Sequence, residues 1–312
     1  MGSFFHAVHV FADRLAAVHW SFLALALALH LLRLVLRALA WRAILTAAYP
    51  DERPRFRSAF GAYVAGVGVN SVAPARAGDV IKLYLIKQRM PEASYTTLAP
   101  TLLAETLFDF FVGLALIGWA LSLGVLPAHQ VYSRLPAVDW GFFLRNEKWT
   151  EIGIAVVFVV ALTGFIVFLE KGEAFRARFA RGFAIMRQPR RFVVRVVVPQ
   201  ALSWVLRLGT IYYFLRAFSV HASIHNALLA MVVDSLATLF PATPGGAGTK
   251  QGLIVFLFGN KVPKPALLAF SVGMNIATVV FNLVVGSIAL FAMARTLSWR
   301  RLRSEQREEA TS

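Results

Sequence analysis

The 312-residue chain contains no cysteine and few charged residues. The lack of cysteine excludes disulfides, cysteine-ligated iron–sulfur clusters and catalysis by a thiol. Charged side chains make up 15% of the sequence, whereas a soluble domain carries about 25%. Hydrophobic residues make up 58%, and the mean hydropathy is +0.64. This composition predicts an all-α polytopic membrane protein, because helices satisfy their own backbone hydrogen bonds in lipid.

Five apolar runs come close to or exceed the roughly 20 residues that cross a bilayer core of about 30 Å. They lie at 20–40, 97–125, 152–169, 196–218 and 266–294. The first run ends in "RALAWR" and not in a small-residue cleavage site, so a cleaved signal peptide is not expected.

Acidic residues are half as many as basic ones, 16 against 32, which gives a net charge of +16. No basic soluble module is evident, so nucleic-acid binding is not expected. In a membrane protein, cationic loops mark the cytoplasmic side and contact anionic headgroups. The loop 170–195 and the tail 295–312 are rich in arginine. We therefore expect both to be cytoplasmic and the N-terminus to be extracytoplasmic.

Two stretches with proline and glycine interrupt the apolar pattern: "NSVAPARAGDVIK" at 70–82 and "FPATPGGAGTKQG" at 240–252. The side assignment requires the segment around each break to enter and leave the membrane on one face. The sequence thus predicts a single membrane domain, 1–312, with two opposed re-entrant helical hairpins in an inverted repeat. The expected parts are a first repeat 17–125 with hairpin 58–90, a linking span 152–169, a second repeat 196–294 with hairpin 227–259, and the tail.

Each break suits an anion, because a helix N-terminus offers unpaired N–H groups and a partial positive charge. Arg76 and Lys82 accompany the first break, and Lys250 accompanies the second. The glycines that let backbone approach a ligand are Gly245, Gly246 and Gly248. The alternative is that these glycines only permit tight turns and close helix packing. The second break is not a Walker loop, since the GxxxxGK[ST] spacing is missing.

Several ionisable residues fall inside predicted spans or hairpins, where a charge costs about 2.5 kcal/mol or more unless it faces the bundle interior. Glu105 and Asp109 are four residues apart and share a helix face. They could pair with Arg33, Arg37 or Arg207, relay protons, or form a hydrolytic pair. The candidates for intramembrane charge pairing or proton coupling are Arg33, Glu105, Asp109, Arg207 and Asp234.

At the two breaks the sequence resembles the lysylphosphatidylglycerol synthase transmembrane (flippase-like) family, also called UPF0104 or YbhN-like. Its first pattern, roughly N-x-x-[LA]-P-x-R-x-G-[ED]-x-x-[RK], is matched by Asn70, Pro74, Arg76, Gly78, Asp79 and Lys82. Its second, P-x-[TS]-P-G-G-x-G-x-[RK]-E, is matched from Pro241 to Lys250, with Gln251 in place of the acid. Glu105 and Asp109 match E-R-x-x-D, with Thr106 in place of arginine. The resemblance adds Asn70 and Asp79 to the candidate headgroup-binding residues.

The resemblance implies a lipid flippase or transporter acting on an anionic headgroup of a phospholipid, lipid-linked sugar or hopanoid-type lipid in the bacterial inner membrane. No aminoacyl-transferase domain accompanies it here, so lipid lysylation is not expected. The alternatives are a membrane-embedded lipid or glycan transferase and a non-transporting partner of lipid-synthesis enzymes. No DxD or DDxxD motif occurs, and His221 and His225 have no further ligand nearby. We therefore expect no metal, no cofactor and no enzyme; a homo-oligomer is left open.

Overall fold

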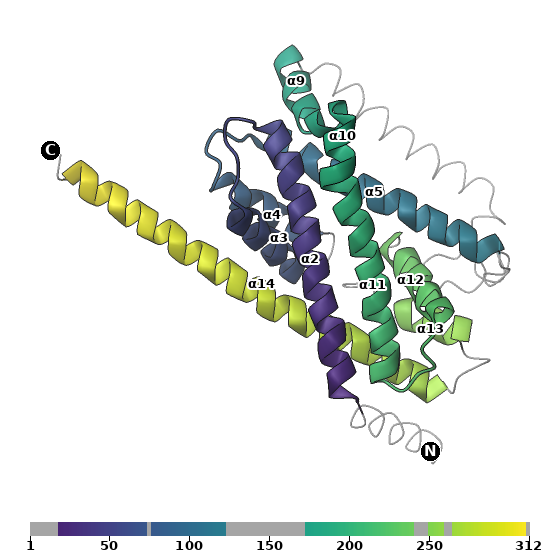
Figure 1. Ribbon diagram of the computed structural model, residues 1–312. Coiled ribbons are helices and arrows are strands. Elements are labelled where there is room, and N and C mark those ends of the chain that lie inside the picture. Colours follow the sequence, from purple (N-terminus) through teal and green to yellow (C-terminus); the bar gives the residue numbers. More distant parts are fainter. Residues whose placement is uncertain (1–17, 74–75, 123–171, 240–248, 259–263, 310–312) are drawn as a thin grey trace, which may run out of the picture.

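A computed structural model describes residues 18–73, 76–122, 172–239, 249–258 and 264–309. All regular structure in these ranges is helical, which confirms the predicted all-α class. The helices are α2 (Trp20–Ala48), α3 (Phe56–Asn70), α4 (Ala77–Lys87), α5 (Tyr95–Ser122), α9 (Glu173–Arg181), α10 (Pro189–Phe192), α11 (Val198–Ala217), α12 (Ile224–Leu239), α13 (Thr249–Phe258) and α14 (Lys264–Glu309) (Figure 1).

Four helices are long and apolar enough to cross a membrane: Trp20–Ala48, Tyr95–Ala120, Pro189–Ala217 and Ala266–Arg295. They correspond to four of the five predicted spans, and the fifth, 152–169, lies outside the described residues. Each leaves large apolar side chains exposed; on α14 these recur at Ile276, Val280, Val284 and Ile288. Such stripes suit contact with lipid tails, and the chain is a polytopic membrane protein.

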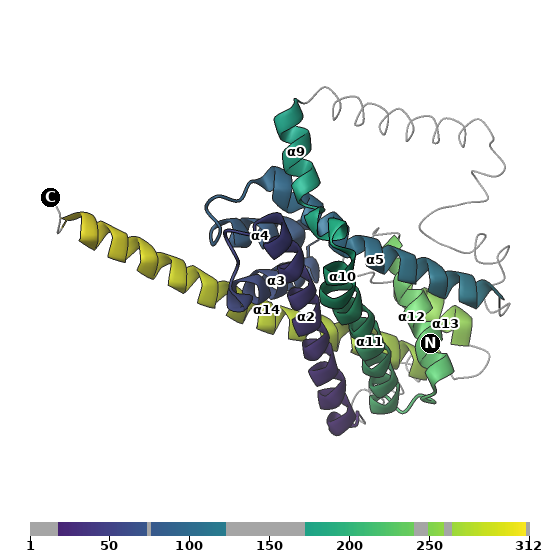
Figure 2. The ribbon, with the colours of Figure 1, turned by 45° about the horizontal axis from the view of Figure 1, so that its top comes forward.

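The helices build two large apolar cores that share α2 and α14, beside two smaller ones. One core packs α11, α12 and α13 together with the start of α14. The other packs α3 and α4 against α2, with Met293 from the far part of α14. Helices α2 and α11 lie side by side between them in both views (Figures 1 and 2).

Each of the two large cores contains a pair of helices joined at a sequence break. The α3–α4 pair begins and ends near the C-terminal end of α2, because Ser94 N–H donates to the Tyr49 hydroxyl over 2.8 Å. The α12–α13 pair starts after α11, at the opposite end of the bundle, where His19 N–H donates to Ala217 C=O. Two helical hairpins thus start from opposite ends; their re-entrant character and the inverted repeat remain predictions.

Helix α14 runs past both cores because small residues let it approach α3 closely. A Cβ on Gly68 would lie 2.9 Å from the Asn282 carbonyl oxygen, and one on Gly286 would lie 2.9 Å from the Gly68 Cα. Both positions therefore need glycine, a device common between membrane helices. Farther along, Arg89 donates to Met293 C=O over 2.9 Å. These contacts lay α14 along the first hairpin, from Gly68 near its tip to Arg89 at its base.

Candidate headgroup site

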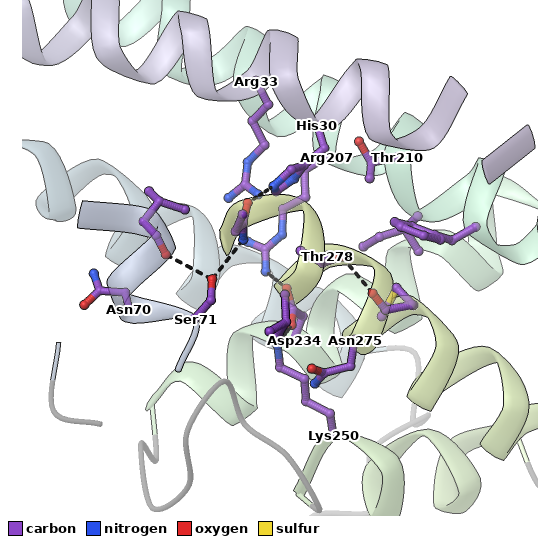
Figure 3. A pocket seen from close by; sticks show the side chains of 16 residues that line it. His30, Arg33, Asn70, Ser71, Arg207, Thr210, Asp234, Lys250, Asn275 and Thr278 are labelled. Atoms are coloured by element: carbon purple, nitrogen blue, oxygen red, sulfur yellow. Dashed lines mark hydrogen bonds and ion pairs between the residues drawn. The ribbon is translucent and has the colours of Figure 1, made fainter. Parts of the chain in front are cut away.

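A pocket of about 250 Å³ lies between the two cores, where the hairpins from the opposite ends meet (Figure 3). Its walls come from α2, the end of α3, and helices α11 to α14. The apolar part of the lining consists of Val67, Ile211, Phe214, Met274 and Val279. The polar part consists of His30, Arg33, Asn70, Ser71, Arg207, Thr210, Asp234, Lys250, Asn275, Thr278 and Asn282.

Asp234 joins two cations at the wall formed by the second hairpin. Its Oδ1 lies 2.5 Å from Lys250 Nζ, and its Oδ2 accepts from Arg207 Nη2. The Asp234 side chain keeps 23% of its surface exposed. The Arg207 guanidinium also lies 4.7 Å from the centre of the Trp204 ring, a cation–π contact. This carboxylate is therefore fully engaged with cations and still reachable.

Arg33 on α2 adds a third cation to the pocket. Figure 3 shows its side chain extending from α2 towards the space that Arg207 borders. The side chain is half-buried, and no hydrogen bond or ion pair joins it to any described residue. With histidine left uncounted, the lining carries three cations, Arg33, Arg207 and Lys250, against one acid, Asp234, a net charge of +2. Such an excess in a concave site attracts anions.

Asn282 ties three helices together beside this cation. Its Oδ1 accepts from His30 Nε2 over 2.9 Å, and its Nδ2 donates to Ser71 Oγ over 3.1 Å. These bonds connect α14 with α2 and with the tip of the first hairpin, so they fix the pocket wall. Asn282 thus acts between helices.

A second group of charges lies outside the pocket, between α2, α3, α4 and α5. We call it the closed ion cluster: Arg37, Tyr63, Lys82, Glu105 and Asp109. Arg37 Nη2 lies 3.1 Å from Glu105 Oε1 and 2.5 Å from Asp109 Oδ2, and Lys82 Nζ lies 2.6 Å from Glu105 Oε2. Of the pairings left open by the sequence, the one with Arg37 is therefore the one formed.

The closed ion cluster is also enclosed by aromatic and hydroxyl groups. The Tyr63 hydroxyl accepts from Arg37 Nε over 2.6 Å and donates to Glu105 over 2.8 Å. Lys82 Nζ lies 4.3 Å and 4.0 Å from the ring centres of Trp41 and Tyr63. Two cations face two carboxylates, and Glu105 keeps only 4% of its side-chain surface exposed. The cluster is neutral; Arg37, Lys82 and Glu105 are buried, whereas the Asp109 side chain keeps 28% of its surface exposed.

The structure places the described site residues at the pocket, in the closed ion cluster and after the first break. Asn70, Lys250, Arg33, Arg207 and Asp234 line the pocket. Lys82, Glu105 and Asp109 form the closed ion cluster, and their predicted roles in headgroup binding and proton coupling stay predictions. Gly245, Gly246 and Gly248 lie outside the described residues.

Arg76 and Asp79 follow the first break, outside the lining of the pocket. Arg76 precedes α4 with an exposed side chain and a left-handed backbone, φ 56° and ψ 35°. Asp79 Oδ1 accepts from the Asn70 amide over 3.1 Å, and Gly78 N–H donates to Asn70 Oδ1 over 2.7 Å. Asn70 therefore holds the break together while it borders the pocket.

Sequence reasoning gave no site role to several residues that the structure brings to these two places. His30, Ser71, Thr210 and Thr278 line the pocket, and Tyr63 links Arg37 to Glu105. One signal was available for His30, since it lies three residues before Arg33 and so shares its helix face. The others come from helix packing, which spacing along the chain does not reveal.

The comparisons with known proteins point to one family of membrane proteins. The family model "Lysylphosphatidylglycerol synthase TM region" matches residues 4–286. A UPF0104 membrane protein of Methanothermobacter thermautotrophicus is 24% identical over 89% of this chain and 86% of its own. One of Methanocaldococcus jannaschii is 22% identical over 62% of this chain and 80% of its own. No solved structure matches the chain. The chain belongs to the lysylphosphatidylglycerol synthase transmembrane region family.

Proposed function

We propose that the protein moves an anionic lipid headgroup across the membrane, as a flippase or transporter. The observation that carries the proposal is the pocket with three cations against one carboxylate, set between apolar helices. Carrying phosphate through hydrocarbon requires the anion to exchange its water for fixed cations and donors. Arg33, Arg207 and Lys250 supply the cations, and arginine can hold phosphate with two parallel hydrogen bonds.

The dimensions of the pocket support a headgroup as the cargo. Its volume of about 250 Å³ falls just below the range of about 300–1,000 Å³ typical of sites for whole small molecules. It therefore suits the polar end of a lipid, with the acyl or prenyl chains left outside among the apolar helix faces. Its residues on α2 and α14, such as Arg33 and Thr278, lie well inside the two candidate spans.

The distribution of charge supports the orientation predicted from the sequence, with a cytoplasmic C-terminus. The basic helices α9 and α10 lie at the end of the bundle where α2 ends, in both views (Figures 1 and 2). Single cysteines replacing the exposed Arg176 and His221 should be labelled from opposite faces of the membrane, since the native chain has no cysteine. Labelling of both from one face would contradict this orientation.

Reconstitution tests the function itself. The full chain is placed in liposomes that contain fluorescent lipids with a phosphate headgroup, and lipid exchange between leaflets is followed with a membrane-impermeant quencher. We expect exchange with the wild type and with Arg42→Gln, whose side chain bonds Pro54 C=O outside the pocket, and loss of exchange with Lys250→Gln. Formation of a new lipid or glycan product would favour a transferase. Neither exchange nor product would favour a non-transporting partner of lipid-synthesis enzymes.

A further inference from the structure

We propose that Asp234 is an internal counter-ion that occupies the place of the cargo anion when the pocket is empty, and that an entering phosphate group must displace it. This inference rests on the proposed function, because it concerns how the same pocket takes up its anion. It assigns Asp234 a role in setting affinity and selectivity.

The geometry of the carboxylate carries the inference. Asp234 uses its two oxygens on two different cations, Oδ2 on Arg207 and Oδ1 on Lys250. Two oxygens of a phosphate group can take the same two partners. Asp234 is also the one carboxylate among the described residues that line the pocket. It therefore holds the two cations as a bound phosphate would.

Burial explains why such a counter-ion is needed. The side chains of Arg207 and Lys250 keep 11% and 20% of their surface exposed, among apolar helices. Two cations left unpaired there would lose much of their solvation, so an empty pocket without an acid would be unstable. Asp234 compensates them, and its own exposure of 23% leaves it within reach of the pocket space.

Electrostatics makes the exchange competitive. A phosphate beside Arg207 and Lys250 would lie next to the Asp234 carboxylate, and like charges at this range repel each other. One of the two anions must therefore leave the cations. Arg33 attracts the entering anion first, because its positive charge is not neutralised by an ion pair with any described residue. The exchange then transfers Arg207 and Lys250 from the carboxylate to the cargo.

Asp234→Asn tests the inference, because it keeps the size of the side chain and removes its charge. The full chain in detergent micelles is titrated with short-chain phosphatidic acid and, separately, with inorganic phosphate. We expect the variant to bind phosphatidic acid at least tenfold more tightly than the wild type. Its thermal midpoint should be lower without ligand and should rise more on ligand addition, since the anion replaces the missing counter-ion.

Asp109→Asn is the matched control, because it removes a carboxylate from an arginine in the closed ion cluster, outside the pocket lining. It should lower the thermal midpoint with no gain from added anion. If Asp234→Asn does not fold, Lys250→Gln is compared with the charge-balanced pair Lys250→Gln/Asp234→Asn. The pair should bind more tightly than Lys250→Gln alone.

The outcomes separate the inference from the proposed function. If the wild type binds phosphatidic acid and removal of the carboxylate leaves binding equal or weaker, the counter-ion role of Asp234 is overturned and the headgroup site stands. If inorganic phosphate binds as tightly as the lipid and shows the same gain, the counter-ion role stands and the lipid specificity fails. If no form binds either anion, both are overturned.

Discussion

The two charged groups of this membrane protein differ in their balance of charge and in whether they border the pocket. The closed ion cluster sets Arg37 and Lys82 against Glu105 and Asp109, so its charges balance. The pocket sets three cations against Asp234, whose side chain keeps 23% exposed. In both groups a lysine from the second helix of a hairpin forms an ion pair with an acid. The two groups therefore share this arrangement but differ in net charge.

This difference in charge balance indicates a structural role for the closed ion cluster and an anion-binding role for the pocket. Charges that are all paired and balanced offer no excess charge to an ion, and breaking one pair destabilises the helices that they join. An excess of one sign beside open space attracts an ion of the other sign. Substitutions should therefore separate the two groups by readout, with stability changing in the closed ion cluster and anion binding changing in the pocket.

The largest effect is expected from Glu105→Gln in the closed ion cluster. The substitution removes the carboxylate that Arg37 and Lys82 share, so Lys82 is left buried without its acid. Loss of one partner of a buried pair costs about 3–5 kcal/mol. The free energy of unfolding, measured by reversible SDS denaturation, should fall by that amount, while anion affinity of the folded fraction stays near the wild-type value.

A second substitution sharpens this prediction. Lys82→Met/Glu105→Gln leaves Arg37 with Asp109, which restores the balance of charge. The double variant should be more stable than Glu105→Gln alone. Additive losses would show that charge balance does not account for the closed ion cluster.

Much of the fold could be predicted from the sequence, because lipid imposes simple rules on length and hydropathy. Four predicted spans match helices long enough to cross a membrane, and the breaks at 70–82 and 240–252 follow α3 and α12. The rule that buried charges need partners also gave pairing with an arginine as one of the roles open to Glu105 and Asp109. The choice of Arg37 follows from the packing of α2 against α5, which sequence spacing does not give.

The site was predictable only in part, for a physical reason. Charge and helix breaks pointed to Lys250, Arg207 and Asp234 before their contacts were known. Like Lys250, Lys82 follows a proline–glycine break in the sequence, yet its side chain faces Glu105 and two aromatic rings. Which way a lysine points depends on the neighbours that its helix meets, and a motif does not encode them.

Arg33→Gln should have the largest effect on binding in the pocket. Hydrogen bonds that involve a charged group contribute about 1.5–3 kcal/mol, so affinity for short-chain phosphatidic acid should fall about 10- to 100-fold. Stability should not fall, because Arg33 has no ion pair with the described residues to lose. Arg37→Gln, one turn along the same helix, is the control and should show the reverse. A lower thermal midpoint with unchanged affinity for Arg33→Gln would remove it from the site.

Tyr63→Phe tests the closed ion cluster with a smaller change. The hydroxyl lies between Arg37 Nε and Glu105 Oε1, and removing it leaves both with one hydrogen bond fewer. We expect a loss of about 1–3 kcal/mol in the free energy of unfolding and no change in anion affinity. Tyr84→Phe, at a half-exposed position on α4, is the matched control and should change neither. Weaker anion binding by Tyr63→Phe would show that the closed ion cluster and the pocket are energetically coupled.

The smallest effect is expected at Arg76, which lies outside both charged groups. Its φ of 56° is left-handed, a conformation that costs a residue with a Cβ about 1–2 kcal/mol. Glycine removes that strain but adds about 0.5–1 kcal/mol of chain entropy to the unfolded state. Arg76→Gly should thus raise the free energy of unfolding by up to about 1 kcal/mol, whereas Arg76→Ala keeps the strain and should not. If the guanidinium binds the headgroup, as the sequence predicts, both variants should slow lipid exchange equally. Wild-type exchange by Arg76→Gly would show that this position needs a left-handed backbone and not a charge.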